Sequence, residues 1–270
     1  MWAVTQRLLL GGERVATQLD GLGVRGGGVV LVHGSMRSAG GDAEAMADAL
    51  RRALGPEGTL VVPAFTPENS DTSRSYLDRV RGLSEQARAA VRATMPPFDP
   101  AVSPARAMGV LAETVRLTPG ALRSGHPQTS FAAIGPAAGK LLAGHRQDCH
   151  LGEDSPLARL YEADAQVLLL GTGFGSCTAF HLAEYRLPAP ARRLYRCVVA
   201  PEGRRRWWQY EDIELDDSDF PALGHDFVRR AAEGSVRTGT VGSARSRLFR
   251  FRAAVDFATE WLKEHRPGTG

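Results

Sequence analysis

Lysine is almost absent from this chain of 270 residues, because Lys140 and Lys263 are the only two among its 33 lysine and arginine residues. Arginine therefore carries nearly all of the positive charge, and the formal net charge is only +3. So small and scattered an excess gives no reason to expect a nucleic-acid partner. The one tight basic cluster, residues 204–206, precedes Trp207 and is more typical of an exposed hairpin turn than of a surface that stacks bases.

Long apolar runs are also missing from the sequence. No stretch approaches the roughly 18 consecutive apolar residues of a membrane-spanning helix. Residues 1–7 contain a short apolar patch without the layout of a signal peptide. The sequence therefore predicts a cytoplasmic protein with no membrane partner.

Cysteine is rare, with Cys149, Cys177 and Cys197 as the only examples. An odd number without metal-ligand spacing argues against a disulfide framework and against a zinc ribbon. His145, Cys149 and His150 lie close together in the sequence, but their polar loop offers no fourth ligand. We therefore expect no bound metal.

Two catalytic signatures are incomplete. Residues 31–35, Leu-Val-His-Gly-Ser, resemble the start of an α/β-hydrolase, yet no serine lies in the G-x-S-x-G pattern that this fold requires. Gly171 and Gly173 suggest a dinucleotide fingerprint, but Ser176 stands where the third glycine is needed. These gaps argue against a hydrolase built around His33 and against a dinucleotide-binding enzyme.

Strands alternate with helices through residue 185, which is typical of a parallel α/β sheet. Short apolar runs predict strands at 28–32, 59–64, 129–134 and 166–170. Helical periodicity and capping residues predict helices at 5–22, 42–54, 83–94, 104–116, 136–142 and 157–163.

The rest of the chain has a different pattern. It predicts an antiparallel hairpin at 194–200 and 207–214, helices at 218–232 and 252–263, and a frayed tail at 267–270. We therefore expect one α/β domain over residues 1–270. Its mostly parallel central sheet is flanked by helices, and its C-terminal part is less regular and antiparallel.

A glycine-rich loop, residues 171–176, leads from an apolar strand to His181 and Glu184. If Thr178 caps a helix, these two side chains share one helical face. A helix N-terminus disfavours the charged imidazole, and a neutral imidazole beside a carboxylate can take a proton from a substrate. The alternative is an ordinary connection with a surface His and Glu. Cys177 is more typical of a small packing residue than of a nucleophile.

Carboxylates crowd residues 211–219, where six of the nine positions are acidic. One interpretation is a solvated loop that precedes a helix. The other is a cleft wall whose negative potential attracts a polycationic ligand.

These features, in this order, resemble the aminoglycoside 3-N-acetyltransferase family over nearly all of the chain. The matching segments are residues 32–35, 58–63, 95–100, 103–104, 108–109, 123–127, 130–135, 154–157 and 181–185. Three positions depart from the family pattern: Gly34 replaces a serine, and Cys177 and Ala179 replace an asparagine and a serine. These losses of polar groups bear on the choice of acceptor.

The resemblance implies an enzyme that transfers an acetyl group from acetyl-coenzyme A to the 3-amino group of an aminoglycoside and so confers resistance. It implies direct transfer in a ternary complex, with His181 as the general base. Glu184, Glu211 or Asp212 would orient the imidazole and stabilise its cation.

The resemblance also implies binding residues for both substrates. Those for coenzyme A are Ser35, Met36, Arg37, Ser103, Met108 and Thr178. Those for a cationic small-molecule amine are Glu68, Asp71 and Glu211. Two alternatives are an acetyltransferase for another amine, such as a biosynthetic intermediate, and a non-catalytic relative that binds coenzyme A. Monomer and homodimer are both compatible with the sequence.

Overall fold

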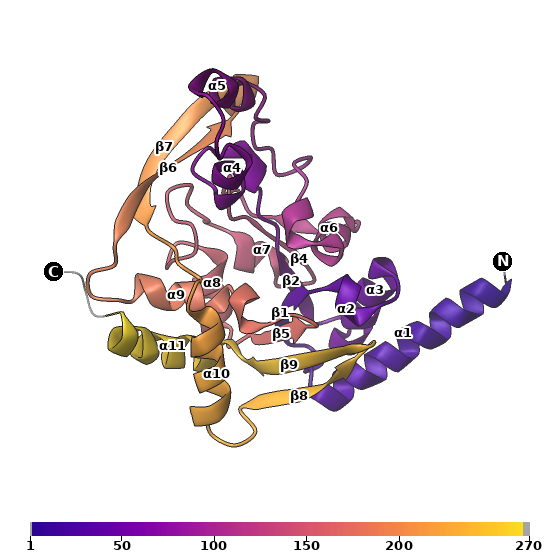
Figure 1. The fold of residues 1–270 in the computed structure, drawn as a ribbon. Helices are drawn as coiled ribbons and strands as arrows, with labels where there is room; N and C mark the ends of the chain where they lie inside the picture. Colours follow the sequence, from indigo (N-terminus) through magenta and orange to yellow (C-terminus); the bar gives the residue numbers. More distant parts are fainter. Residues whose placement is uncertain (1, 267–270) are drawn as a thin grey trace.

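A seven-stranded sheet runs through the middle of the molecule in the order β3-β4-β2-β1-β5-β9-β8 (Figure 1). The structure is a computed structural model that describes residues 2–266, with side chains from residue 12 onward, so the predicted tail lies outside the described residues. The strands are β1 (Val29–Gly34), β2 (Thr59–Pro63), β3 (Leu122–Arg123), β4 (Phe131–Ile134), β5 (Gln166–Leu170), β8 (Val236–Val241) and β9 (Ala244–Arg250).

The three central strands, β2, β1 and β5, are parallel, and the outer strands pair antiparallel. The central strands bury both faces: in β1, Val30 and Val32 pack on one side of the sheet and Leu31 on the other. Strands of this kind read as continuous apolar runs, which is why the sequence predicts them well. The α/β class with its parallel centre is confirmed.

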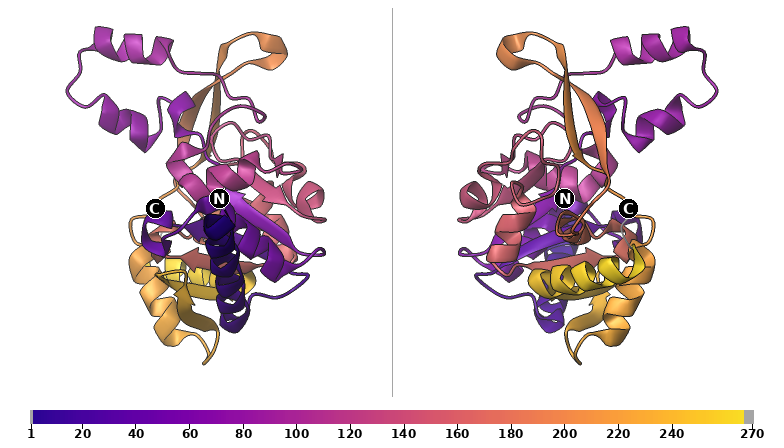
Figure 2. Two further views of the ribbon diagram at one scale, coloured as in Figure 1. Left: turned by 90° about the vertical axis from the view of Figure 1, so that its right-hand side faces the viewer. Right: turned by 90° about the vertical axis from the view of Figure 1, so that its left-hand side faces the viewer.

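Helices cover both faces of the sheet (Figures 1 and 2). One face carries α1 (Trp2–Leu22), α2 (Met36–Ala39), α3 (Ala43–Leu54) and α6 (Val110–Leu117). The other carries α7 (Ala138–Leu142), α8 (Pro156–Glu162), α9 (Ala179–Tyr185), α10 (Phe220–Arg230) and α11 (Phe251–His265). Local sequence fixes several starts: Asp42 accepts hydrogen bonds from two N–H groups of α3, and Ser155 with Pro156 opens α8.

A projecting part of the molecule, here called the arm, stands away from the central sheet (Figure 2). It consists of the antiparallel pair β6 (Arg192–Val199) and β7 (Arg206–Ile213) with α4 (Arg74–Arg79) and α5 (Glu85–Ala93). The predicted hairpin is therefore confirmed. The arm has its own small core, built on Tyr76, Val80, Met95 and Val198.

The structure differs from the sequence expectations in several places. The short elements α2, α4 and β3 are not predicted, and two larger differences follow. No helix opens at Ser103–Pro104: Ser103 Oγ instead accepts a hydrogen bond from the Asp99 N–H, and α6 begins only after Gly109, whose φ of 89° interrupts the helix. The hairpin β8–β9 is not predicted, because β8 is a half-exposed edge strand and β9 alternates arginines with its buried residues. Within residues 2–266, no helix is both long and apolar enough to cross a membrane.

Candidate active site

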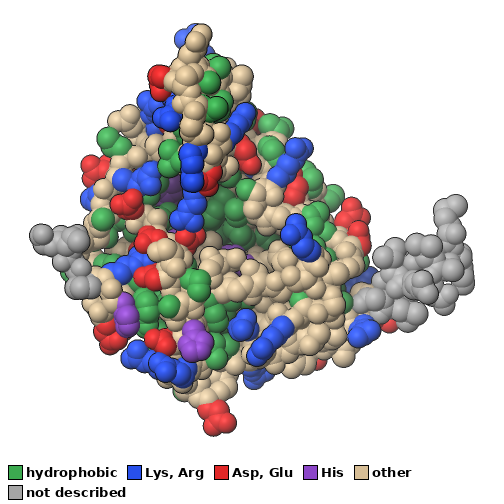
Figure 3. All heavy atoms as spheres, viewed as in Figure 1, with side chains coloured by type: hydrophobic (Ala, Val, Ile, Leu, Met, Phe, Trp, Pro, Cys, Tyr) green, Lys and Arg blue, Asp and Glu red, His purple; other side chains and the backbone are tan. Residues whose placement is uncertain are grey.

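A cavity of about 300 Å³ opens where β1, β2 and β5 end. Parallel strands bring their carboxyl ends to one edge of a sheet, which is where ligands bind in open α/β folds. Figure 3 shows a hydrophobic hollow between the arm and the central sheet. The residues of the cavity wall that matter most here are His33, Leu111, Thr172, Ser176, Thr178 and His181.

A second cavity, of about 290 Å³, lies on the side of the arm. Arg74 of α4 and Arg193 of β6 contribute to its wall. Phe65, Met108, His181 and Asp217 line both cavities. His181 therefore stands where the two cavities meet, so that it can reach ligands held in either of them.

His181 and Glu184 form a hydrogen-bonded pair on α9. The distance between His181 Nδ1 and Glu184 Oε2 is 2.6 Å, and the two side chains are 12% and 2% exposed. Because a carboxylate only accepts hydrogen bonds, Nδ1 is the protonated nitrogen and Nε2 is the basic one. The ring of Phe220 packs against the imidazole with 4.7 Å between ring centroids.

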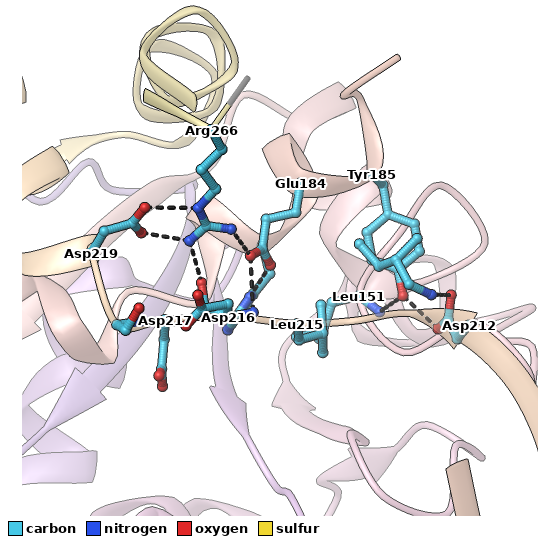
Figure 4. A network of polar contacts seen from close by, with 12 residues as sticks. Leu151, Glu184, Tyr185, Asp212, Leu215, Asp216, Asp217, Asp219 and Arg266 are labelled. Atoms are coloured by element: carbon cyan, nitrogen blue, oxygen red, sulfur yellow. Dashed lines mark hydrogen bonds and ion pairs between the residues drawn. The ribbon is translucent and has the colours of Figure 1, made fainter. Parts of the chain in front are cut away.

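Arg266, which follows α11, occupies the other oxygen of Glu184 (Figure 4). The distance from Arg266 Nη1 to Glu184 Oε1 is 2.6 Å, and the backbone N–H of Asp216 donates to the same oxygen at 3.0 Å. Glu184 is thus a buried carboxylate whose two oxygens are both satisfied. No sequence motif points to Arg266, because it lies 82 positions from Glu184.

Glu211 and Asp212, the other two acids considered as partners of the imidazole, both have other partners: Glu211 pairs with Arg192, and Asp212 is hydrogen-bonded elsewhere. Its carboxylate accepts from the His150 N–H at 2.7 Å, the Tyr185 hydroxyl at 2.5 Å and the Ile213 N–H at 2.8 Å. Burial raises the pKa of Asp212 despite these bonds. The geometry therefore favours Glu184 over Asp212 as the acid that orients the imidazole, and Asp212 joins the arm to α9 instead.

Thr178 does not cap α9 with its side chain. Its hydroxyl is instead 3.2 Å from His33 Nε2, and both side chains line the first cavity. Burial, followed by the nearby charge of His181, lowers the pKa of His33 to about 3. His33 is therefore a neutral hydrogen-bonding partner at neutral pH.

The residues expected to bind coenzyme A fall into two groups. Met108 and Thr178 line the first cavity. Ser35, Met36, Arg37 and Ser103 line neither cavity. Ser35 is the N-cap of α2, and Arg37 is exposed.

The acids expected to bind an amine lie outside both cavity walls. Asp71 is paired with Arg196 and Glu211 with Arg192, so arginines of β6 already neutralise them. Glu68 is exposed on a 3-10 turn. Asp217, which the sequence marked only as part of the acidic segment 211–219, is the carboxylate that lines both cavities.

The three departures from the family pattern lie in tightly packed places. A Cβ at Gly34 would come within 2.7 Å of Leu111 Cδ2, so glycine lets α6 approach β1. Cys177 and Ala179 are fully buried. Burial raises the pKa of Cys177 to about 12, so its thiol stays protonated and is a poor nucleophile.

The structure also brings together three buried histidines that the sequence separates. His126 stacks between His145 and His150, with ring centroids 4.8 and 4.7 Å away. Burial lowers the pKa of each of them. Across residues 2–266, no group of three or more His, Cys, Asp or Glu side chains has the arrangement of a metal site.

Comparison with known proteins supplies the family. The model of the aminoglycoside 3-N-acetyltransferase family matches residues 31–263. The SPbeta prophage-derived aminoglycoside N(3')-acetyltransferase-like protein YokD of Bacillus subtilis is 38% identical over 93% of this chain and 91% of its own length. Aminoglycoside N(3)-acetyltransferase VII of Streptomyces paromomycinus is also 38% identical, with the same two coverages.

Solved structures agree with the sequence relatives. The crystal structure of YokD superposes with a TM-score of 0.86, at 36% identity and 95% coverage of both chains. The structure of AAC-IIIb in binary complex with CoASH has a TM-score of 0.80 at 31% identity. The match covers 96% of this chain and 98% of the AAC-IIIb chain. The structure of AAC-VIa bound to sisomicin also has a TM-score of 0.80, at 29% identity. The match covers 95% of this chain and 98% of the AAC-VIa chain. The chain therefore belongs to the aminoglycoside 3-N-acetyltransferase family, and it is an acetyltransferase.

Proposed function

We propose that this protein acetylates the 3-amino group of aminoglycosides with acetyl-coenzyme A and so confers resistance to them. The observation that carries the proposal is the position of His181 at the junction of two cavities, with its Nδ1 bound to Glu184. Two substrates that react directly must meet beside one base, and such a junction suits that requirement. The relatives named as aminoglycoside acetyltransferases support the substrate class.

His181 is the general base of this proposal. Its Nε2 takes the proton that the acceptor amine loses as the amine nitrogen bonds to the acetyl carbon and the carbon–sulfur bond breaks. Glu184 keeps the proton on Nδ1 and stabilises the imidazolium that forms. The protonated thiol of Cys177 supports direct transfer rather than an acyl-cysteine intermediate.

The first cavity fits the pantetheine arm of coenzyme A, which is extended and carries amide groups. When bound, acetyl-coenzyme A supplies the acetyl group as a reactive thioester. The wall offers apolar contacts from Met108 and Leu111 and hydroxyl groups from Thr172, Ser176 and Thr178. We propose that Ser35, Met36, Arg37 and Ser103 act farther out, toward the phosphates. The relative solved with CoASH supports this cofactor.

The second cavity is the proposed acceptor site. Asp217 is the one carboxylate among the described residues that line it. Its partner Arg74 lies at 3.1 Å and is largely exposed, so an ammonium group of the acceptor would share or replace that contact. The relative solved with sisomicin supports an aminoglycoside as ligand.

The direct test is the release of coenzyme A thiol from acetyl-coenzyme A with a panel of aminoglycosides of the kanamycin, gentamicin and neomycin types. We expect rapid release and acetylation at the 3-amino group, read by mass spectrometry and NMR of the product. Binding of acetyl-coenzyme A without release for any member of the panel would contradict the proposed acceptor and leave the cofactor assignment standing.

A second acceptor class is favoured by one observation. Arg74 and Arg193 both line the second cavity. The carboxylate nearest to Arg193 is that of Glu214, at 3.8 Å, although Arg193 also donates to the Thr72 carbonyl oxygen at 3.1 Å. Two guanidinium groups suit an amine that also carries a phosphate or carboxylate. Thiol release with such amines but not with aminoglycosides, and its loss in Arg193→Gln, would establish this alternative.

A further inference from the structure

Arg266 is bound to the catalytic pair through several hydrogen bonds, although it lies after the last helix (Figure 4). Its guanidinium donates to Glu184 Oε1 at 2.6 Å, to the Asp216 carbonyl oxygen at 2.5 Å, and to both carboxylate oxygens of Asp219. The side chain is 22% exposed and Glu184 is 2% exposed. This is the bidentate geometry for which arginine, rather than lysine, is suited.

Carboxylates outnumber guanidinium groups around this pair. Burial opposes the charge of Arg266, but its hydrogen bonds to Asp219 and Glu184 outweigh burial and raise the pKa of the guanidinium. Arg266 and Asp219 form one half-buried ion pair, and Glu184 lies between Arg266 and His181. The other charged or titratable groups near the imidazole come from four directions. His33 of β1 is neutral, Asp216 and Asp217 precede α10, and Arg74 of α4 pairs with Asp217. His150, which is also neutral, and Arg193 of β6 line the second cavity together with His181.

A buried carboxylate whose only partner is an imidazole favours protonation of that imidazole, because the charged form pairs with it. A fixed guanidinium on the second oxygen supplies the positive charge instead. The imidazole can then remain neutral while the carboxylate stays ionised. A general base needs this state before the acceptor amine arrives.

We infer that Arg266 is a positioning residue of the His181–Glu184 pair, which keeps Glu184 ionised and in place so that His181 is available as a neutral base. This inference rests on the proposed role of His181. It makes the end of α11 part of the active site, even though Arg266 lines neither cavity.

Arg266→Gln and Asp219→Asn should move the titration midpoint of His181 in opposite directions. Arg266→Gln removes the positive charge beside Glu184, so the titration midpoint of His181 should rise by about one pH unit. Asp219→Asn removes a negative charge on the far side of Arg266, so the same midpoint should fall. Arg266→Lys keeps the positive charge but loses the bidentate geometry. The midpoint of His181 in Arg266→Lys should therefore lie closer to the wild-type value than the midpoint in Arg266→Gln.

NMR titration of the imidazole C–H signals measures these midpoints without any acceptor. The signal of His181 is identified by its loss in His181→Gln. Arg230→Gln is the matched control, since it breaks another arginine–carboxylate contact between α10 and α11, that of Arg230 with Glu264. Its midpoint should equal that of the wild-type protein.

An unchanged midpoint in Arg266→Gln, or shifts of the same sign in Arg266→Gln and Asp219→Asn, would overturn the inference, because loosening of a structural anchor does not depend on the sign of the removed charge. If Arg266→Gln does not fold, Asp219→Asn decides alone: a lower midpoint supports the account and any other result contradicts it. With an acceptor in hand, the acid limb of kcat/KM should move to higher pH in Arg266→Gln. Absence of turnover in the wild-type protein would count against the proposed function and leave the titration test intact.

Discussion

At the scale of single residues, the active site depends on carboxylates that differ in their partners. Glu184 is shared by an imidazole and a guanidinium, whereas Asp212 receives three hydrogen bonds from neutral donors. Both are buried, but only Glu184 touches the proposed base. The hydrogen bonds of Asp212 connect β7 to the segment at His150 and to the end of α9, as Figure 4 shows for Tyr185.

Asp212→Asn should lower the free energy of unfolding by about 1–3 kcal/mol. The amide of asparagine has only one acceptor oxygen, so its NH2 group would face a donor in either orientation. That donor would be the Ile213 N–H in one orientation, and the His150 N–H with the Tyr185 hydroxyl in the other. Urea denaturation measures the change. The adjacent Glu211→Gln is the control and should have little effect, because Glu211 forms an exposed pair with Arg192. Equal stability of both variants would contradict this account.

The sequence could predict the site residues that lie close together in the chain, but not those that come from distant segments. His181 and Glu184 are three residues apart, and helical periodicity alone puts them on one face. Arg266 and Asp216 reach Glu184 only through the packing of α9 and α11, so no local pattern reveals them. The acids Asp71 and Glu211 were expected to bind substrate, but sequence cannot show that arginines of β6 neutralise them.

At the scale of elements, the loop between β5 and α9 positions the base. Gly171 begins this loop with a φ of 66°, and a Cβ there would lie 2.8 Å from the Cβ atoms of Ala244 and Ser38. Both the backbone angle and the contact require glycine. The loop can therefore turn directly from the sheet edge into the cavity wall formed by Thr172 and Ser176.

Gly171→Ala should destabilise the protein by at least about 1–2 kcal/mol, from the left-handed backbone alone. Gly173→Ala, two positions later, is the matched control, since its φ is −97° and a Cβ there meets nothing within 4 Å. Thermal melts of the two variants measure the difference. A Tm for Gly171→Ala as high as that of Gly173→Ala would show that the turn tolerates a side chain.

Elements with strong local signals were predicted well, and those set by distant contacts were not. Apolar residues make up most of each central strand, and Asp42 and Ser155 mark helix starts. By contrast, Ser103–Pro104 has the local signature of a helix start, yet Gly109 delays α6. The hairpin joins the sheet through the pairing of β9 with β5, and the polar sequence of β8 and β9 does not reveal that pairing.

At the scale of the whole molecule, two apolar cores share one sheet, and the active site lies between that sheet and the arm. The single domain over residues 1–270 stays a prediction. His150 lines the second cavity, and His126 and His145 join it in a cluster of contacting rings. All three are buried and hydrogen-bonded to neighbours such as Thr129 and Tyr210. This cluster links the stability of the fold to pH.

Stability should fall as the pH drops below about 6.5, the usual pKa of histidine in an unfolded chain. Burial lowers the pKa of His145 to about 4 and of His33 and His150 to about 3, and it holds that of His126 well below the usual value. A folded-state pKa below the unfolded one means that the unfolded state binds protons first. The neutral buried histidines therefore contribute their full stabilisation above about pH 6.5. Below that pH, the free energy of unfolding falls by up to about 1.4 kcal/mol for each histidine and each pH unit.

Urea denaturation between about pH 7 and about pH 5.5 measures this effect, since most carboxylates stay ionised over that range. Equal free energies of unfolding at the two ends would show that the buried histidines do not titrate as described. The exposed His225 serves as the control, because His225→Gln should leave the slope unchanged.

The central claim, that His181 is the base at the junction of two cavities, is tested most directly by His181→Ala. Turnover, measured as coenzyme A thiol release with the best wild-type acceptor, should fall by at least about 100-fold. Calorimetry should give an unchanged Kd for coenzyme A, and His225→Ala should behave like the wild-type protein. Turnover in His181→Ala close to that of the wild-type protein would contradict the account.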